Sequence, residues 1–273
     1  MNLIKINDIN ASELDVYIRN TENQLRAEED IFVAESAYVS LRALEAGYEP
    51  LSILVESDRI ETEAQPVFDA LDEDTKDSIP VYVADRKIVI NITGHKLVRG
   101  LWMTFRRKPE LTVEDICTSG KRIAVLVDVV KAENVGAIIR SAAALGMDGV
   151  ILTHPSVDPL TRRSARVSMG TVFQIPWAKA SWEDSQGTAL IEKIRSYGIK
   201  TVAMALTEDS TSIDNDEIRA NGKLAVVLGT EGTGLPKDVI SACDYRVMIP
   251  MYNGVDSLNV AAASAISFWE LMK

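Results

Sequence analysis

The chain has 273 residues, of which 47% are hydrophobic, and its formal net charge at pH 7 is −11. This length allows one large core or two modest ones, and two domains are expected. No run approaches the roughly 18 apolar residues of a membrane span, and no signal peptide begins the chain, so we expect a cytoplasmic protein without membrane association.

The cysteines and histidines do not form a metal-binding pattern. Cys117 and Cys243 lack metal-ligand spacing, and no cluster of cysteines or carboxylates accompanies His95 or His154. We therefore expect no metal and no disulfide bond, with both cysteines as buried free thiols.

The first half of the chain predicts a small α/β domain over residues 1–108. Apolar spacing predicts helical structure over 12–47. Strands are expected at 51–55, 81–84 and 87–92. A polar stretch with Pro109 and Gly120 predicts a linker over 109–121.

The charge is unevenly distributed. Residues 1–120 hold 13 basic and 23 acidic side chains, a net −10, whereas 121–273 hold 16 and 17, a net −1. Residues 86–108 carry seven basic side chains and no acidic one, and they include Trp102 and Phe105. Aromatic rings stack on unpaired bases, so this stretch predicts RNA contact, although the two rings could equally pack in a core.

The candidate RNA-binding residues fall into two groups. The second group belongs to an arginine-rich helix, for which ordinary surface charge is the alternative. The candidates are Lys96, Arg99, Arg106 and Arg107, followed by Arg162, Arg163 and Arg166.

A second domain is predicted over residues 122–273. Continuous apolar segments that alternate with helical ones predict an α/β fold, a mostly parallel sheet with helices on both faces. The expected strands are 122–130, 149–153, 171–176, 201–206, 223–229 and 245–251, and the expected helices include 134–146, 188–198 and 257–273. Ligands of such sheets bind beyond the carboxyl ends of the strands.

Two segments of this domain carry possible chemistry. In ENVGAIIRSAAALG, Asn134 can cap a helix, and Arg140 is the only charge between Glu133 and Asp148. In LAVVLGTEGTGLP, a strand runs into a glycine-rich turn that carries Glu231. The glycine spacing matches neither a phosphate-binding loop nor a dinucleotide fingerprint.

A third segment, IPMYNGVDSLNVAAASAISFWELMK, places Ser257 and Asn259 at the start of a long apolar helix, where either could simply act as a cap.

Together the three segments resemble the SpoU (TrmH-like) family of RNA ribose methyltransferases in the SPOUT superfamily. The resemblance rests on N-x-G-A-I-I-R, V-L-G-T-E-G-x-G-L-P, and I-P-M followed by S-L-N-V, and it covers residues 122–273.

The sequence departs from the family pattern at one place, and a looser resemblance extends to the first domain. Lys131, Ala132 and Glu133 stand where members often have a proline before the motif asparagine. The first domain is similar to the small ribosomal-protein-like α/β domain that precedes many SpoU catalytic domains and binds RNA.

The resemblance implies a deep trefoil knot (the SPOUT fold), S-adenosylmethionine as cofactor, and a homodimer formed through the first and last helices of the catalytic domain. The implied catalytic residues are Asn134, Arg140, Glu231, Ser257 and Asn259. The implied cofactor-binding residues are Gly229, Thr230, Glu231, Gly232, Gly234, Ile249, Met251, Ser257, Leu258 and Asn259.

The implied activity is methylation of a ribose 2′-hydroxyl, of ribosomal RNA in preference to transfer RNA. The resemblance assigns activation of the hydroxyl to Arg140, but a guanidinium with a pKa above about 12 hardly deprotonates, so charge stabilisation is the alternative role. A tRNA 2′-O-methyltransferase, a non-catalytic RNA-binding assembly factor and a nucleotide-dependent oxidoreductase remain open.

Overall fold

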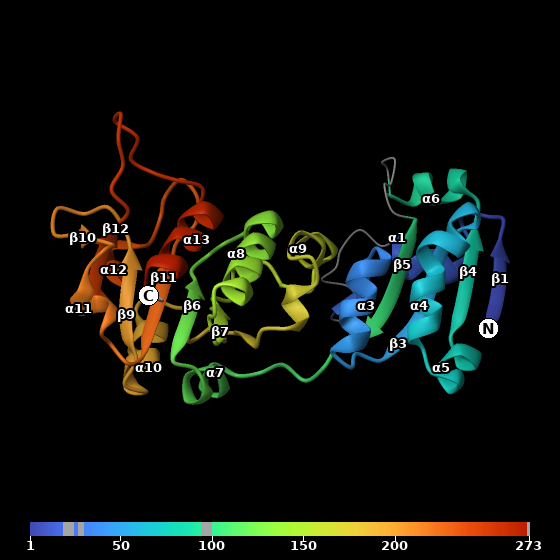
Figure 1. Ribbon diagram of the computed structural model, residues 1–273, viewed down its shortest axis with the longest axis horizontal. Coiled ribbons are helices and arrows are strands. Elements are labelled where there is room, and N and C mark those ends of the chain that lie inside the picture. The colour runs from blue at the N-terminus through green and yellow to red at the C-terminus, as the bar shows by residue number, and fades with distance from the viewer. Residues whose placement is uncertain (19–24, 27–29, 94–99, 272–273) are drawn as a thin grey trace. The chain divides into compact units, whose positions relative to one another are not determined.

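The computed structural model describes residues 1–18, 25–26, 30–93 and 100–271. The chain forms two compact units, each built on its own sheet (Figure 1). One unit comprises residues 1–109 and 160–173, and the other comprises 110–159 and 174–273. None of the helices in these described ranges has the length and hydropathy that a membrane span requires.

The N-terminal unit contains a mixed five-stranded sheet of order β1-β4-β3-β5-β2. Strands β1, β4 and β3 run parallel, and β5 pairs antiparallel with both β3 and β2. The strands are β1 (Asn2–Ile6), β2 (Ile31–Glu35), β3 (Pro50–Glu56), β4 (Pro80–Ala84) and β5 (Leu101–Arg106). The helical elements are η1 (Ser12–Leu14), α1 (Asp15–Ile18), α3 (Ala37–Glu45), η3 (Ser57–Arg59), η4 (Ile60–Ala64), α4 (Gln65–Ala70), α5 (Glu73–Ser78), α6 (Arg86–Thr93), α9 (Arg162–Val167) and η5 (Thr171–Phe173).

The expectation of helical structure over 12–47 is wrong in its centre, where β2 occupies Ile31–Glu35. Four of these five residues are buried, and all five pair with β5, so sheet pairing overrides the apparent helical spacing. Ser36, with a φ of 92°, then turns the chain, and its hydroxyl accepts a hydrogen bond from the backbone N–H of Val39 to begin α3.

The strand expected at 87–92 is also wrong, because α6 covers Arg86–Thr93. The β-branched residues there suggest a strand, but the place beside β3 is taken by β5. At the start of the helix, the backbone carbonyl of Asp85 accepts hydrogen bonds from the N–H groups of Ile88 and Val89. The side chain of Val89 is buried.

The sequence left open whether Trp102 and Phe105 stack on RNA bases or pack in the core. They are 2% and 0% exposed, so both rings pack in the core and neither is available to stack on an RNA base. The ring of Phe105 stacks on Phe32 at 5.4 Å between centroids.

Residues 160–173 belong to the N-terminal unit although the chain reaches them from the second sheet. Helix α9 packs against β2, and the ring of Phe173 lies 5.6 Å from Phe32 and 5.3 Å from Tyr48. The strand expected at 171–176 is therefore wrong: residues 171–173 form a short 3-10 helix, and the strand begins at Trp177.

The C-terminal unit contains a seven-stranded, wholly parallel sheet of order β10-β12-β9-β11-β6-β7-β8, which confirms the parallel α/β prediction. The strands are β6 (Arg122–Leu126), β7 (Gly149–Leu152), β8 (Trp177–Lys179), β9 (Lys200–Met204), β10 (Thr211–Ser212), β11 (Leu224–Leu228) and β12 (Tyr245–Met248). The helices are α7 (Val113–Ser119), α8 (Ala132–Ala144), α10 (Ala189–Ser196), α11 (Asp216–Arg219), α12 (Lys237–Ala242) and α13 (Val260–Leu271).

Helices cover both faces of this sheet. Apolar side chains of α7, α10 and α12 share one buried cluster with alternate residues of the strands, while α13 packs against α8 and β11. Helix α7 lies within the expected linker 109–121: Thr112 and Asp115 form a capping box at its start, and Ile116 and Cys117 are buried. Most of that segment therefore belongs to the core of the second unit.

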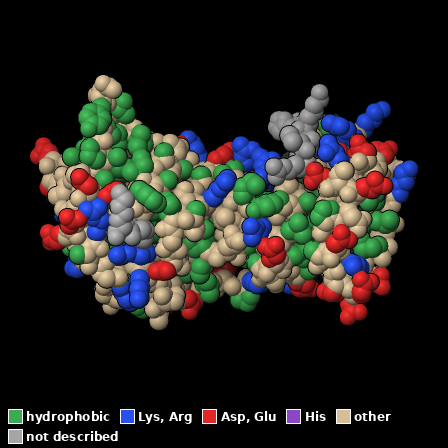
Figure 2. All heavy atoms as spheres, in the orientation of Figure 1, with side chains coloured by type: hydrophobic (Ala, Val, Ile, Leu, Met, Phe, Trp, Pro, Cys, Tyr) green, Lys and Arg blue, Asp and Glu red, His purple; other side chains and the backbone are tan. Residues whose placement is uncertain are grey.

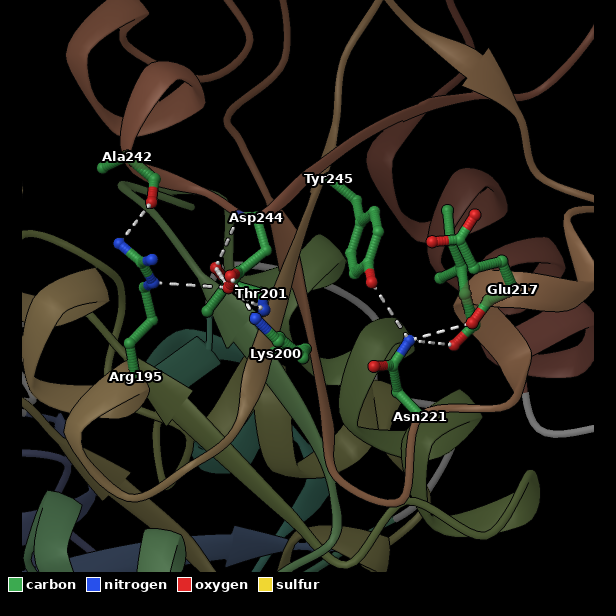
Figure 3. A network of polar contacts seen from close by, with 9 residues as sticks. Arg195, Lys200, Thr201, Glu217, Asn221, Ala242, Asp244 and Tyr245 are labelled. Carbon is green, nitrogen blue, oxygen red and sulfur yellow. Dashed lines mark hydrogen bonds and ion pairs between the residues drawn. The ribbon is translucent and has the colours of Figure 1, made fainter.

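Asp244, at the start of β12, is the centre of a polar network that ties this strand to β9 (Figure 3). Its carboxylate accepts from the backbone N–H and the hydroxyl of Thr201, both at 3.0 Å. Lys200 donates at 2.9 Å, and Arg195 forms an ion pair at 3.3 Å. Burial raises the pKa of Asp244, but the hydrogen bonds from Lys200 and Thr201 and the charge of Arg195 more than offset this and lower the pKa overall.

We expect Asp244→Ala to destabilise the protein by about 2–3 kcal/mol, because several hydrogen bonds to a partly buried charged group are lost. The contribution of Asp244 is present above the unfolded-state pKa of about 3.9 and is lost as the pH falls towards the lower native value. Urea denaturation at pH 7 and pH 3 measures both effects. Asp209→Ala, which removes an exposed carboxylate paired with Arg246, is the control and should cost less than about 1 kcal/mol; equal losses in the two variants would contradict the prediction.

Candidate functional site

Three loops leave the carboxyl ends of the parallel strands of the C-terminal unit. They join β6 to α8, β11 to α12, and β12 to α13. Because β6 and β11 are direct neighbours, with Leu126 opposite Leu228, the first two loops emerge side by side at one edge of the sheet. This is the edge at which open parallel sheets bind their ligands.

Asn259 joins the three loops through both ends of its amide. Its Oδ1 accepts from the backbone N–H groups of Ala261 (2.9 Å) and Ala262 (3.3 Å) and so caps α13. Its Nδ2 donates to Oδ1 of Asn134 at 3.2 Å and to Oε1 of Glu231. Asn259 therefore caps α13, as the sequence allowed, and the same side chain also contacts Asn134 and Glu231.

Glu231 is held through both carboxylate oxygens. Asn259 donates to Oε1, and Lys131 forms an ion pair with Oε2. Lys131, followed by Asn134 and Asn259, lowers the pKa of Glu231 below its ordinary value, against a desolvation effect that raises it. The carboxylate is therefore ionised and fixed in orientation at neutral pH.

Residues 229–234 form a tight turn in which two glycines have positive φ. Gly232 and Gly234 have φ of 91° and 69°, and a side chain at either would be strained although the space around them is open. Gly234 donates to the backbone carbonyl of Thr230 at 3.1 Å. Gly229 is buried, and a Cβ atom there would lie 2.4 Å from the backbone carbon of Gly234.

Arg140 and Ser257 stand apart from this hydrogen-bonded group. Arg140 is exposed on α8, six residues beyond Asn134 and therefore about 9 Å further along the helix axis. Within the described residues, its guanidinium has no hydrogen-bonding or ion-pairing partner. Ser257 is also exposed, and its hydroxyl donates to Asp256 at 3.0 Å.

The loop from β12 to α13 carries the remaining predicted cofactor residues. Ile249 and Met251 are half-buried, and Leu258 is exposed. Tyr252 and Val255, near the tip of the same loop, are 81% and 53% exposed. The site therefore combines a polar, hydrogen-bonded group with an accessible apolar loop. Nowhere in the described chain do three or more His, Cys, Asp or Glu side chains gather in a way that could hold a metal ion.

The predicted RNA-binding residues are distributed over the N-terminal unit. Lys96 and Arg99 lie outside the described residues. Arg106 is exposed and pairs with Glu49 at 2.9 Å, whereas Arg107 is buried.

The three arginines of α9 belong to the same unit. Arg162 donates to the backbone carbonyl of Tyr17 at 3.1 Å, and Arg166 forms an ion pair with Glu35 at 2.6 Å. Arg163 is exposed.

Sequence reasoning missed Lys131 as a member of the site. It is noticeable in the sequence only as a departure from the family pattern, because its partner Glu231 is 100 positions away. Nothing in the spacing predicts this contact, which depends on the pairing of β6 with β11.

Comparison with known proteins agrees with this geometry. Residues 121–269 match the SpoU rRNA Methylase family. An uncharacterized tRNA/rRNA methyltransferase of Mycobacterium bovis is 33% identical over 243 residues, which is 88% of this chain and 80% of that protein.

Solved structures resemble the chain over nearly its whole length. An AdoMet-bound rRNA methyltransferase from Sinorhizobium meliloti has a TM-score of 0.80 at 25% identity, covering 98% of this chain and 97% of the other. An RNA 2′-O ribose methyltransferase has a TM-score of 0.81 at 26% identity, covering 98% of each chain.

The fold and the site thus define an α/β protein of two units with its candidate site at the carboxyl edge of a parallel sheet. The chain belongs to the SpoU rRNA Methylase family.

The turn at 229–234 provides a direct test of the site's packing. We expect Gly229→Ala to destabilise the protein by about 1–3 kcal/mol, because the added methyl group would overlap the backbone of Gly234 and force the turn open. Gly222→Ala is the control, since its added Cβ would meet no atom within 4 Å and its φ is not positive. Chemical denaturation of both variants makes the comparison, and a Gly229→Ala protein as stable as Gly222→Ala would contradict the close approach.

Proposed function

We propose that the chain transfers a methyl group from S-adenosylmethionine to a ribose 2′-hydroxyl of RNA, using residues of the C-terminal unit. The observation that carries the proposal is the convergence of Asn134, Glu231 and Asn259, from three separate segments, in one hydrogen-bonded group. Family membership supports the reaction class, and the AdoMet-bound relative supports the cofactor.

The cofactor would be held between the turn at 229–234 and the loop at 249–259. The turn offers backbone N–H and C=O groups, since the space beside Gly232 and Gly234 is open. Ile249, Met251 and Leu258 supply apolar surface suited to an adenine ring, while Thr230 and Ser257 add hydroxyl groups. These residues fit the donor, which supplies a methyl group on a positively charged sulfur.

The polar group would position the ribose. Glu231, held by Lys131 and Asn259, offers a fixed carboxylate, and Asn134 is fixed by its bond to Asn259. Orienting the hydroxyl for in-line attack is a main source of rate enhancement in such a transfer.

Arg140 would act on the RNA by electrostatics. A guanidinium remains protonated at neutral pH, so we assign it to binding a phosphate and stabilising the negative charge that develops on the 2′-oxygen. Its exposure on α8 leaves it accessible for this role. The proton of the hydroxyl leaves to solvent in this scheme.

We further propose that the N-terminal unit binds the RNA substrate as a ribosomal-protein-like domain. Arg162, Arg163 and Arg166 lie on α9 of this unit and Arg106 on β5; Arg166 and Arg106 would exchange their partners Glu35 and Glu49 for phosphates. Phosphate contacts of this kind provide affinity that falls with salt and carries no sequence specificity.

We propose in addition a homodimer formed through α8 and α13, together with a trefoil knot in the chain around the loops at 229–236 and 249–259. Exposed apolar side chains support the dimer: Ile266 and Trp269 on α13 are 40% and 61% exposed. Figure 2 shows hydrophobic side chains gathered over the loop that precedes this helix. The family resemblance supports the knot, which spacing alone could never establish. A protein of this function would work in the cytoplasm.

We expect Arg140→Ala to abolish methyl transfer to RNA while binding of S-adenosylmethionine is largely retained, because the guanidinium acts on the RNA and not on the cofactor. Methyl transfer is measured with labelled cofactor, and cofactor binding by calorimetric titration of the same samples. Full activity in the variant would remove the role of Arg140. Failure of the wild-type protein to bind S-adenosylmethionine would favour the non-catalytic assembly factor.

For the substrate we propose ribosomal RNA, supported by the family's description and by the rRNA methyltransferase among the similar structures. Mapping of 2′-O-methyl groups in total RNA, with and without the gene, should show a site lost from ribosomal RNA. A loss confined to transfer RNA would contradict this assignment and favour a tRNA 2′-O-methyltransferase.

A further inference from the structure

Lys131 is one of the three residues before Asn134 that depart from the family pattern, and its side chain contacts Glu231 in the glycine-rich turn. It is the residue that precedes α8, and its backbone carbonyl accepts from the N–H groups of Asn134 and Val135. Its side chain extends to Oε2 of Glu231. The start of α8 and the turn after β11 are therefore joined by one residue.

Glu231 receives a different donor on each oxygen. Asn259 holds Oε1 through an amide whose own direction is set by the start of α13. Oε2 is held by Lys131. Because Lys131 is the donor to Oε2, removing it would leave the carboxylate held only by Asn259 and Asn134 and free to turn towards them.

This ion pair is poorly suited to stabilise the fold. The Lys131 side chain is 63% exposed and that of Glu231 is 26% exposed, and ion pairs of this kind contribute about 0–1 kcal/mol to folding. Its main consequence is therefore local: it fixes the direction of Glu231. The pKa values agree with the contact, since Glu231 raises the pKa of Lys131 and Lys131 lowers that of Glu231.

We propose that Lys131 is a positioning residue for methyl transfer, which acts by holding the Glu231 carboxylate in the orientation that receives the ribose. The inference rests on the proposed function. It gives a role to Lys131, one of the three residues that the motif comparison alone leaves as an unexplained departure.

The test compares three variants of the full-length protein. Lys131→Met removes the charge and keeps much of the side chain's length, and Lys131→Arg keeps the charge and can still reach a carboxylate. Lys121→Met is the matched control, because it removes one exposed positive charge of the same unit outside the network. Thermal denaturation of each variant establishes that all of them fold.

We expect Lys131→Met to lower kcat for methyl transfer at pH 7 by roughly 10- to 100-fold, since small misplacements of a positioning group cost rates of this order. The Lys131→Arg protein should retain most of the activity, and Lys121→Met should match the wild-type protein. Glu231 stays ionised at pH 7 in every variant, so the loss at this pH reports its orientation.

The acidic side of the pH–rate profile gives a second readout that a purely structural role would not move. In Lys131→Met the pKa of Glu231 rises towards the ordinary value of about 4.3, and the acidic limb should shift to higher pH. Carbon-13 NMR titration of the Glu231 carboxyl group measures the same shift without any turnover.

Equal kcat values and equal acidic limbs for Lys131→Met and Lys121→Met would overturn the inference. Absence of methyl transfer by the wild-type protein would contradict the proposed function itself. In that event the carboxyl titration still tests the ion pair, and an unchanged pKa of Glu231 in Lys131→Met would reject it.

Discussion

The parallel pairing of β6 with β11 is the constraint on which the site depends. Ile123 to Leu126 lie opposite Ala225 to Leu228, so the two strands end at the same level and their following loops meet. Lys131 and Asn134 thereby come within reach of Glu231, although about 100 residues separate them along the chain. Strands of the same composition in another order would leave the same side chains unconnected.

Two further sets of contacts hold the third segment at this edge of the sheet. Asp244 ties β12 to β9 through Thr201, Lys200 and Arg195, which fixes the strand from which the loop at 249–259 departs. At the other end of the loop, Asn259 caps α13 and uses the rest of its amide to contact the first two segments. Asn259 therefore both caps α13 and connects the three segments.

The candidate site contains side chains that are held by hydrogen bonds and side chains that are exposed to solvent. Asn134 and Glu231 are both joined to Asn259 by hydrogen bonds. Arg140 is exposed on the same helix as Asn134.

The sequence by itself determined the class of the C-terminal sheet, because apolar runs alternate with helices, and it singled out Asn134, Glu231 and Asn259 through their motifs. It failed where local pattern and tertiary pairing conflict. Residues 31–35 become a strand because they pair with β5, and residues 86–93 become a helix because β5 occupies the place beside β3.

Only the tertiary structure decided which side chains touch. Residues 160–173 join the first unit because α9 packs against β2 and Phe173 packs with Phe32 and Tyr48, contacts that no spacing reveals. The pairing of Lys131 with Glu231 likewise follows from strand order. Local sequence sets turns, caps and periodicity over a few residues, whereas strand order depends on the packing of the whole domain.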